Sequence, residues 1–216
     1  MAKKMVLILE GSWWNKLETP QILPYFQAYV ATHPHSKIEL LHRTIRNVED
    51  IAHYVSKIPT DGEAFLYIAC HGNKLALTPE DGRKKITRPA LLDALSTDNQ
   101  KGAAISFIHF GCCEMVDPHR RRQDHEEIMD RTGATWVSGY TQSVNWLPST
   151  FLDLALVDGL FTAHTAGLKK IQKKAAADFM KQYDQHARHM GFSGLGRSGK
   201  EKVLFPERLS RKERSD

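Results

Sequence analysis

Two apolar stretches of this sequence end in residues that can carry out thiol chemistry. The first, Ala64–Cys70, is followed by His71-Gly72. The second, Ile105–Phe110, is followed by Gly111–Glu114, which contains two adjacent cysteines. Each run has the length of a buried strand. If the two are neighbouring parallel strands, a histidine and a cysteine meet at the edge where open α/β sheets carry their reactive site. A Cys/His pair there is the minimum for nucleophilic catalysis by a thiol.

An acyl-transfer site needs a nucleophile, a base within reach and hydrogen-bond donors for the oxyanion. Cys113 can supply the thiolate, and His71 can accept its proton. The backbone N–H groups of Gly72 and Cys113 can form the oxyanion hole, and a glycine after the histidine lets a substrate approach the backbone closely. The sequence shows no third member of a triad. A backbone carbonyl could orient the histidine instead.

The sequence supports other roles for these residues less well. Adjacent residues of a strand point to opposite faces, so only one of Cys112 and Cys113 can point into the site. Cys70 and His109 are expected to pack in the core. Adjacent cysteines chelate zinc poorly and lack the spacing of structural zinc sites. We therefore expect neither a metal nor a cofactor.

Composition limits the class of protein. The 216 residues suit one domain, with 41% hydrophobic and 25% charged residues. No apolar run reaches the roughly 20 residues of a membrane helix, and the apolar N-terminal stretch is too short for a signal peptide. Three cysteines do not make a disulfide framework. These features predict a cytoplasmic protein.

The net charge of +5 raises the question of nucleic-acid binding. Much of the positive charge lies in residues 169–181 and 197–214. No zinc-finger spacing, RNA-binding aromatic signature or Gly-rich phosphate loop accompanies it. We interpret the charge as a solvated helix face and a basic tail.

The elements that must position the candidate residues alternate between strand and helix. Short apolar runs predict strands at residues 5–9, 37–42, 65–70, 105–110 and 134–138. Helical spacing or capping predicts helices at residues 20–31, 47–58, 89–95, 124–131 and 148–164, and an amphipathic helix from Leu168. This order predicts an α/β three-layer sandwich with a mostly parallel central sheet.

Three further segments have weaker patterns. Residues 74–77 and 84–87, around Asp81-Gly82, predict a small hairpin. Residues 117–123 predict an arginine-rich loop. From residue 191 glycine, serine and charge dominate, so we expect a domain of residues 1–190 and a basic, flexible tail of residues 191–216 with a possible anchor at Val203–Phe205.

The order of strand, His-Gly, hairpin, helix, strand, Cys and outer strand resembles the caspase-hemoglobinase fold of clan CD cysteine peptidases. That group includes caspases, metacaspases, separase and the bacterial CHAT domains. The run Phe110–Glu114 resembles the CHAT pattern of an apolar strand, small residues, Cys and Glu. Because that pattern places Glu directly after the nucleophile, the resemblance favours Cys113 over Cys112.

A third similarity extends the resemblance over roughly residues 5–165. Residues 139–144 and 148–152 are similar to the caspase run of Gly-Tyr, a Ser-Trp-Arg segment and Gly-Ser-Trp-Phe. The resemblance implies substrate-binding roles for Gly111, Tyr140, Val144 and Trp146. Trp13 and Trp14 can border the same cleft, and residues 140–146 can pair with an extended peptide.

Two departures bear on specificity. Caspases place an arginine near Val144 and a glutamine at the position of Gly111, and these residues select aspartate in the substrate. Both are missing here. Asp153, the nearest carboxylate, falls in the helix after Pro148, where we expect a solvated face. The sequence therefore predicts cleavage after apolar or small residues, with basic residues second.

Together these features predict a cysteine endopeptidase that cuts protein substrates through a Cys/His dyad and a thioacyl intermediate. Small bacterial relatives often act in regulated proteolysis, including defence, so the resemblance implies an activating protein partner. One alternative is a catalytically idle interaction module with the same fold. Another is a nucleic-acid-associated protein that uses the basic helix and tail.

Overall fold

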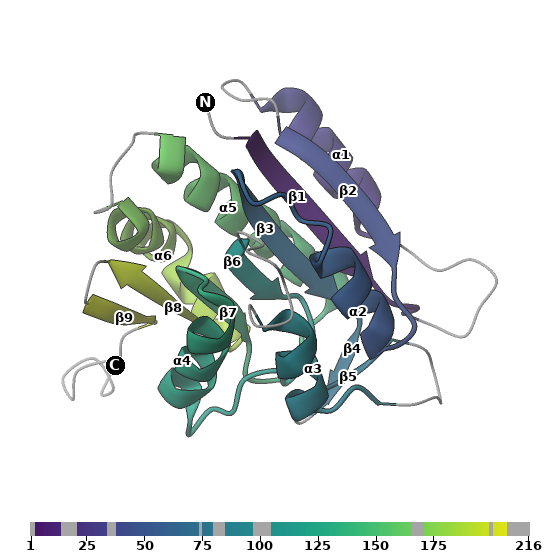
Figure 1. Cartoon of the computed structure of the whole chain (residues 1–216). Coiled ribbons are helices and arrows are strands. Elements are labelled where there is room, and N and C mark those ends of the chain that lie inside the picture. The colour runs from purple at the N-terminus through teal and green to yellow at the C-terminus, as the bar shows by residue number, and fades with distance from the viewer. Residues whose placement is uncertain are drawn as a thin grey trace.

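The computed structural model of the chain describes residues 3–13, 21–33, 38–73, 75–79, 85–96, 105–165, 171–198 and 201–206 (Figure 1). Within these residues, seven strands form one large sheet: β1 (Lys3–Glu10), β2 (Ile38–Thr44), β3 (Gly62–Ala69), β6 (Ile105–Phe110), β7 (Trp136–Tyr140), β8 (Phe192–Ser198) and β9 (Glu201–Phe205). Their spatial order is β2-β1-β3-β6-β7-β8-β9. Two short strands, β4 (His71–Asn73) and β5 (Ala76–Thr78), form a separate antiparallel ribbon.

The first five strands in this order run parallel, whereas β8 is antiparallel to β7, and β9 to β8. Strands covered on both faces are apolar without alternation, and β3 accordingly is buried from Ala64 to Ala69. Parallel strands joined by crossovers bring their C-terminal ends to one edge. The predicted α/β fold with a mostly parallel sheet is confirmed.

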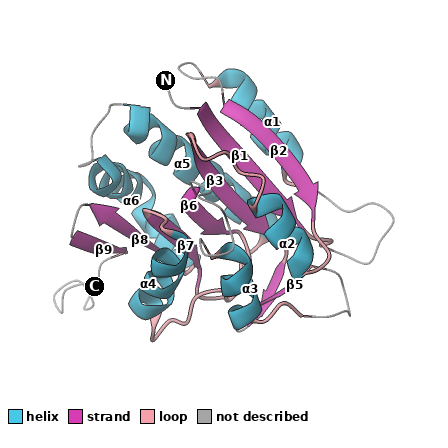
Figure 2. Cartoon of the chain, in the orientation of Figure 1, coloured by secondary structure: helices cyan, strands magenta, loops and turns pink. Residues whose placement is uncertain are grey.

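Helices cover both faces of the sheet (Figure 2). On one face α1 (Leu23–Thr32), α5 (Trp146–Thr165) and α6 (Ile171–His189) pack over residues such as Val6 and Phe65. On the other, α2 (Val48–Val55), α3 (Arg88–Leu95) and α4 (Arg121–Thr132) pack over residues such as Leu66 and Ile108. The protein is therefore the three-layer sandwich that the sequence predicts.

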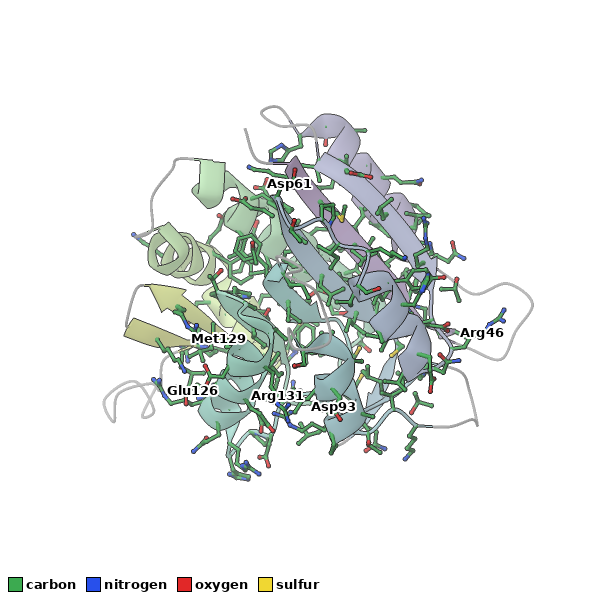
Figure 3. All side chains as sticks on the ribbon, viewed as in Figure 1. Arg46, Asp61, Asp93, Glu126, Met129 and Arg131 are labelled. Atoms are coloured by element: carbon green, nitrogen blue, oxygen red, sulfur yellow. The ribbon has the colours of Figure 1, made fainter. Side chains whose placement is uncertain are left out.

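Local sequence explains several helix ends. The Asn47 side chain accepts a 2.9 Å hydrogen bond from the N–H of Asp50 and so caps α2, as predicted. Gly133 ends α4 in the left-handed conformation, with φ of 71°. Figure 3 shows Arg131 of α4 and Asp93 of α3 on neighbouring helices, and their charged groups lie 3.8 Å apart.

The C-terminal region differs from the prediction of a flexible tail. Residues 192–198 and 201–205 form β8 and β9, and Phe192, Leu195 and Phe205 are buried. A domain boundary at residue 190 would therefore separate β8 and β9 from the sheet to which they belong. The expected anchor at residues 203–205 lies in β9. Residues 199–200 and 207–216 lie outside the described residues.

Other predicted boundaries also shift. The hairpin starts at His71 instead of Lys74, and only the Leu77–Ile86 bridge preserves the predicted pairing. Arg121 and Arg122 begin α4 instead of belonging to a loop. The first helix begins at Leu23, with Pro24 in its first turn. Residues 74 and 80–84, with the expected Asp81-Gly82 turn, and residues 14–20, with the expected helix start at Pro20, lie outside the described residues.

Candidate active site

The two thiol-bearing strand ends lie side by side at the C-terminal edge of the sheet. Strands β3 and β6 pair in parallel with Ile68 opposite Phe110. Beyond the paired residues, the N–H of Gly111 donates a 2.9 Å hydrogen bond to the carbonyl of Ile68. The Sγ atoms of Cys70 and Cys112 are 4.0 Å apart. His71 and Cys113 each come one residue later, so both leave the sheet at the same place.

Gly72 packs directly against the backbone of the cysteine turn. A Cβ atom on Gly72 would lie 2.2 Å from the carbonyl oxygen of Cys113 and 3.1 Å from the Cβ of Cys112. Only glycine permits this approach, so the structure requires a glycine after His71 for packing against the turn. The expected approach of a substrate to this backbone stays a prediction. A second link joins the same segments, because the N–H of Leu75 donates a 3.0 Å bond to the carbonyl of Glu114.

The turn after the nucleophile candidate has an unusual backbone. Glu114 has a φ of 53°, in the left-handed region that non-glycine residues rarely adopt. Its N–H donates a 3.3 Å hydrogen bond to the carbonyl of Gln142. Residues other than glycine keep this conformation only where the surrounding structure holds them in it, and such residues are concentrated at functional sites. Here the turn aims the chain from Cys113 toward the segment after β7.

The neighbouring thiols have different surroundings. Cys112 is 1% exposed and its Sγ donates a 3.1 Å hydrogen bond to the carbonyl of Ile68. Burial raises the pKa of Cys112 well above its usual value, and the Cys70 thiol adds to this. Cys113 is half-buried, and the N–H of Val144 lies 3.4 Å from its Sγ. Of the two, Cys113 is therefore the more accessible thiol.

Two opposing influences act on the Cys113 thiol. Burial raises the pKa of Cys113, and the hydrogen bond from the backbone N–H of Val144 opposes that rise. The negative charges of Cys112 and Glu114, when ionised, also raise it. The net direction is upward, so the resting thiol is protonated.

His71 is exposed, and a backbone carbonyl fixes one of its ring nitrogens. Its Nε2 hydrogen-bonds to the carbonyl oxygen of Trp13, and the two rings meet edge to face with centroids 5.7 Å apart. Because a carbonyl only accepts, Nε2 carries the proton of this hydrogen bond, and in the neutral ring the lone pair is then on Nδ1. The backbone carbonyl that contacts the His71 ring is therefore that of Trp13. Trp14 lies outside the described residues.

The predicted substrate-binding residues separate into two pairs. Val144 contacts Cys113, and Trp146 contacts Trp13 with ring centroids 6.5 Å apart, so both lie beside the candidate dyad. Gly111 and Tyr140 are buried instead. A Cβ on Gly111 would lie 2.2 Å from the Tyr67 hydroxyl oxygen, so this position faces the core.

A buried polar cluster lies beneath Gly111. Asp153 is 0% exposed and accepts hydrogen bonds from the hydroxyls of Tyr67 at 2.6 Å and Tyr140 at 2.5 Å. His109 Nε2 lies 2.7 Å from the same carboxylate. Burial, and then the Asp153 charge, raises the pKa of both tyrosines well above the usual range. The expectation of a solvated Asp153 is wrong, because helical spacing alone does not show which face of α5 meets the sheet.

The sequence argument also missed Glu10, the last residue of β1. Glu10 is 3% exposed, and its carboxylate accepts a 2.8 Å hydrogen bond from the indole N–H of Trp13. The position of Glu10 at a strand end on the reactive edge is the signal that could have identified it.

Among the described residues, no group of three or more His, Cys, Asp or Glu side chains is arranged to hold a metal ion.

Comparison with solved structures identifies the fold. No protein-family model and no curated protein sequence matches this chain. A secreted C11 cysteine protease from Bacteroides thetaiotaomicron, solved with an irreversible peptide inhibitor, is similar with a TM-score of 0.55 and 11% identity, over 90% of this chain and 66% of that one. Caspase-1 from Spodoptera frugiperda is similar with a TM-score of 0.52 and 12% identity, over 94% of this chain and 86% of that one. The chain has the caspase-hemoglobinase fold.

Within the described part of the chain, no helix is both long and apolar enough to cross a membrane.

Proposed function

We propose that this protein is a cysteine endopeptidase in which Cys113 is the nucleophile and His71 the base. The observation that carries the proposal is the close packing of Gly72 against the cysteine turn, where an added Cβ would lie 2.2 Å from the Cys113 carbonyl oxygen. This packing brings the histidine-bearing strand end next to the cysteine turn. The cysteine-protease fold of the two similar structures supports the same reaction class.

The proposed reaction uses the free Nδ1 of His71. Nδ1 takes the proton of Cys113, and the sulfur lone pair forms a C–S bond to the scissile carbonyl carbon. The carbonyl oxygen takes the negative charge, which the backbone N–H groups of Gly72 and Cys113 stabilise. When the electron pair returns, the C–N bond breaks, and the imidazolium gives its proton to the leaving amine.

The second half of the reaction restores the enzyme. His71 removes a proton from water, and the hydroxide attacks the thioacyl carbon. The C–S bond then breaks, a carboxylic acid leaves, and Cys113 recovers its proton from the imidazolium. Throughout, the Trp13 carbonyl holds Nε2–H, which keeps Nδ1 as the nitrogen that exchanges protons.

An aromatic surface beside the dyad supports a preference for apolar substrates. The rings of Trp146 and Tyr25 lie 5.8 Å apart, and those of Tyr25 and Phe151 5.9 Å apart. Phe151 is 55% exposed and Leu147 41% exposed. An aspartate side chain would meet no arginine at positions 111 and 144. We therefore propose cleavage after apolar or small residues, with basic residues second and aspartate disfavoured.

An irreversible peptide probe tests the activity. A fluorescent peptide with a thiol-reactive group should label the wild type and Cys112→Ala, but not Cys113→Ala or His71→Ala. Cys112→Ala is the matched control because it removes a thiol one residue away. A variant that unfolds is identified by circular dichroism. Labelling that depends on Cys112 and not on Cys113 would refute the assignment.

One observation favours the idle interaction module as a second candidate. Burial raises the pKa of Cys113, which keeps the resting thiol protonated. An idle protein would remain unlabelled under all conditions. A regulated peptidase would be labelled faster when an activating partner or a bound substrate brings His71 onto the thiol, and the rate of probe labelling measures this.

The setting of the activity is also part of the proposal. The resemblance to bacterial CHAT domains supports regulated proteolysis in the cytoplasm, as in prokaryotic defence. Because one of the similar structures is of a secreted protease, cell fractionation with an antibody to the chain is the direct test. Recovery of the protein from the culture medium would overturn the cytoplasmic assignment.

A further inference from the structure

Glu10 is a buried carboxylate with three polar partners. Its Oε1 accepts hydrogen bonds from the indole N–H of Trp13 at 2.8 Å and from the backbone N–H of Ile22 at 3.0 Å. Its Oε2 lies 2.7 Å from Nε2 of His42, on the neighbouring strand β2. The Glu10 side chain is 4% exposed and that of His42 16% exposed. Leaving such a carboxylate buried is costly unless partners of this kind satisfy it.

These partners connect Glu10 to the candidate dyad. The Trp13 indole is anchored on Glu10, and the carbonyl of the same residue accepts the hydrogen bond from His71 Nε2. The Trp13 ring also meets the His71 ring edge to face. A change at Glu10 that releases the indole therefore changes the position of the carbonyl that orients the histidine.

The surrounding backbone strengthens this link. Next to Glu10, the N–H of Gly11 donates a 2.8 Å bond to the carbonyl of Ala69, and the N–H of Ser12 donates a 2.6 Å bond to the carbonyl of Pro79. These bonds fix the path of the chain as far as Ser12. The Trp13 side chain beyond them is held by its indole hydrogen bond to Glu10 and by edge-to-face contacts with the rings of His71 and Trp146, so the bond to Glu10 is one of the contacts that set the position of Trp13.

We propose that Glu10 is a positioning residue for His71, acting through Trp13. The inference rests on the proposed function, because it assigns a role in that same site. The carboxylate holds the Trp13 indole, the Trp13 carbonyl holds Nε2–H, and Nδ1 stays free to accept the thiol proton. The His42 ring on β2 lies 2.7 Å from the other carboxylate oxygen and keeps the carboxylate turned toward Trp13.

Three variants and one control test the inference. Glu10→Ala removes all three contacts, Trp13→Phe removes the indole donor but keeps an aromatic ring, and Glu10→Gln keeps an oxygen for the indole. Lys4→Met is the matched control, because Lys4 is a charged residue at the other end of β1 and is only 8% exposed. The Lys4→Met substitution should lower the free energy of unfolding by acting on the same strand, and it leaves Trp13 and His71 unchanged.

The first readout is the tautomer of His71, observed by nitrogen NMR of the imidazole. We expect Nε2–H to dominate in the wild type, Glu10→Gln and Lys4→Met. In Trp13→Phe and Glu10→Ala the two tautomers should become mixed. If both of those variants keep the wild-type tautomer while folded, the inference is wrong. If Glu10→Ala does not fold, Trp13→Phe decides alone.

The second readout is peptide cleavage. We expect kcat of Trp13→Phe and Glu10→Ala to fall by about 10²-fold with little change in KM, because a small misplacement of a catalytic group has costs of that order. Glu10→Gln should recover most of the rate. Equal losses in Lys4→Met would show a purely structural effect and overturn the proposal. If no variant, including the wild type, cleaves peptides, the proposed function fails, and the tautomer measurement still decides the role of Glu10.

Discussion

Cys113 lies in the half-buried turn after β6, where the N–H of Val144 lies 3.4 Å from its sulfur. Because burial raises the pKa of this thiol, alkylation by iodoacetamide should increase with pH through a midpoint above that of an exposed cysteine in a model peptide. Val144→Pro removes the N–H and should move the midpoint higher still. The rate is measured by mass spectrometry across pH. A midpoint below that of the peptide would mean that a positive group reaches the sulfur.

Gly72 gives a second prediction for a single residue. Gly72→Ala should lower the free energy of unfolding by about 1–3 kcal/mol, since the added methyl overlaps a backbone oxygen that cannot move aside. It should also abolish probe labelling, because the strand end must separate from the turn. Denaturant unfolding and the labelling rate measure the two effects.

Gly159 is the matched control for that substitution. A Cβ there would meet only the Cβ of Phe179 at 3.8 Å, an ordinary contact. Because Gly159 lies inside α5, Gly159→Ala should stabilise the protein by about 0.5–1 kcal/mol and leave labelling unchanged. Equal effects of the two substitutions would show that the approach of Gly72 to the turn is not tight.

Among the elements, β8 shows why part of the fold escaped prediction. Its residues read as Phe-Ser-Gly-Leu-Gly-Arg-Ser, with two glycines and no β-branched residue. The glycines are needed because a Cβ on Gly194 would lie 2.6 Å from the Trp136 ring, and one on Gly196 would lie 3.2 Å from it. A composition typical of loops thus forms a strand, because the large ring of Trp136 fills the space that side chains would take.

The role of β8 in the core can be tested directly. Leu195 is fully buried, so Leu195→Ala should lower the free energy of unfolding by about 2–5 kcal/mol. Leu204 on the neighbouring strand β9 is only partly buried, and Leu204→Ala should cost clearly less. Denaturant titration of both variants measures the difference. A loss at Leu195 no larger than at Leu204 would restore the prediction of a loosely attached tail.

Helix α4 is joined to β8 by His125, whose Nε2 lies 3.0 Å from the Ser193 hydroxyl oxygen. Burial, with smaller contributions from Arg121, Arg88 and His109, lowers the pKa of His125 to about 3. The unfolded chain binds this proton below its ordinary pKa of about 6.5, whereas the folded protein does not. Stability should therefore fall as pH decreases from about 6.5 toward 3, by on the order of 1 kcal/mol per pH unit from this residue.

The variant His125→Asn isolates that contribution. Its unfolding free energy should depend less steeply on pH than that of the wild type over the same interval, whatever its absolute stability. Urea titrations at several pH values measure the two slopes. Parallel curves for the two proteins would mean that His125 is protonated in the folded state.

At the scale of the whole molecule, the pairing of basic with acidic side chains argues against the alternative of a nucleic-acid-binding protein. Many basic side chains in the described residues lie next to carboxylates: Arg88 with Asp124 and Glu127, Arg122 with Glu126, Arg131 with Asp93, Arg188 with Asp184, Arg197 with Asp130, and Lys202 with Glu126 and Asp130. Pairs of this kind reduce the attraction for phosphate. We expect no shift of duplex DNA or RNA at physiological salt. A shift that weakens steeply as salt rises would show a phosphate-binding face.

The sequence predicted most of the architecture and the centre of the candidate site. Continuous apolar runs such as residues 64–70 are typical of strands buried on both faces. Because helical segments alternate with these runs, the sequence predicts a parallel sheet. The sequence points to His71 because it directly follows such a run, and to Cys113 because it lies in the turn three residues after the end of another. The contacts of Glu10 with His42, of Trp13 with His71 and of Asp153 with Tyr67 join segments far apart in the chain, and no local sequence pattern indicates them.

The segment after β7 has a consequence for how the protein is made. The N–H of Thr141 donates a 2.8 Å bond to the carbonyl of Gly191, and the side-chain amide of Gln142 donates a 2.7 Å bond to the carbonyl of His189. These bonds hold the segment that brings Val144 to Cys113. A ribosome delivers the chain from its N-terminus, so the dyad emerges well before residues 189–191. The growing chain therefore carries His71 and Cys113 before it contains the residues that hold the Val144 segment, so the complete arrangement around Cys113 forms only after residues 189–191 have been made.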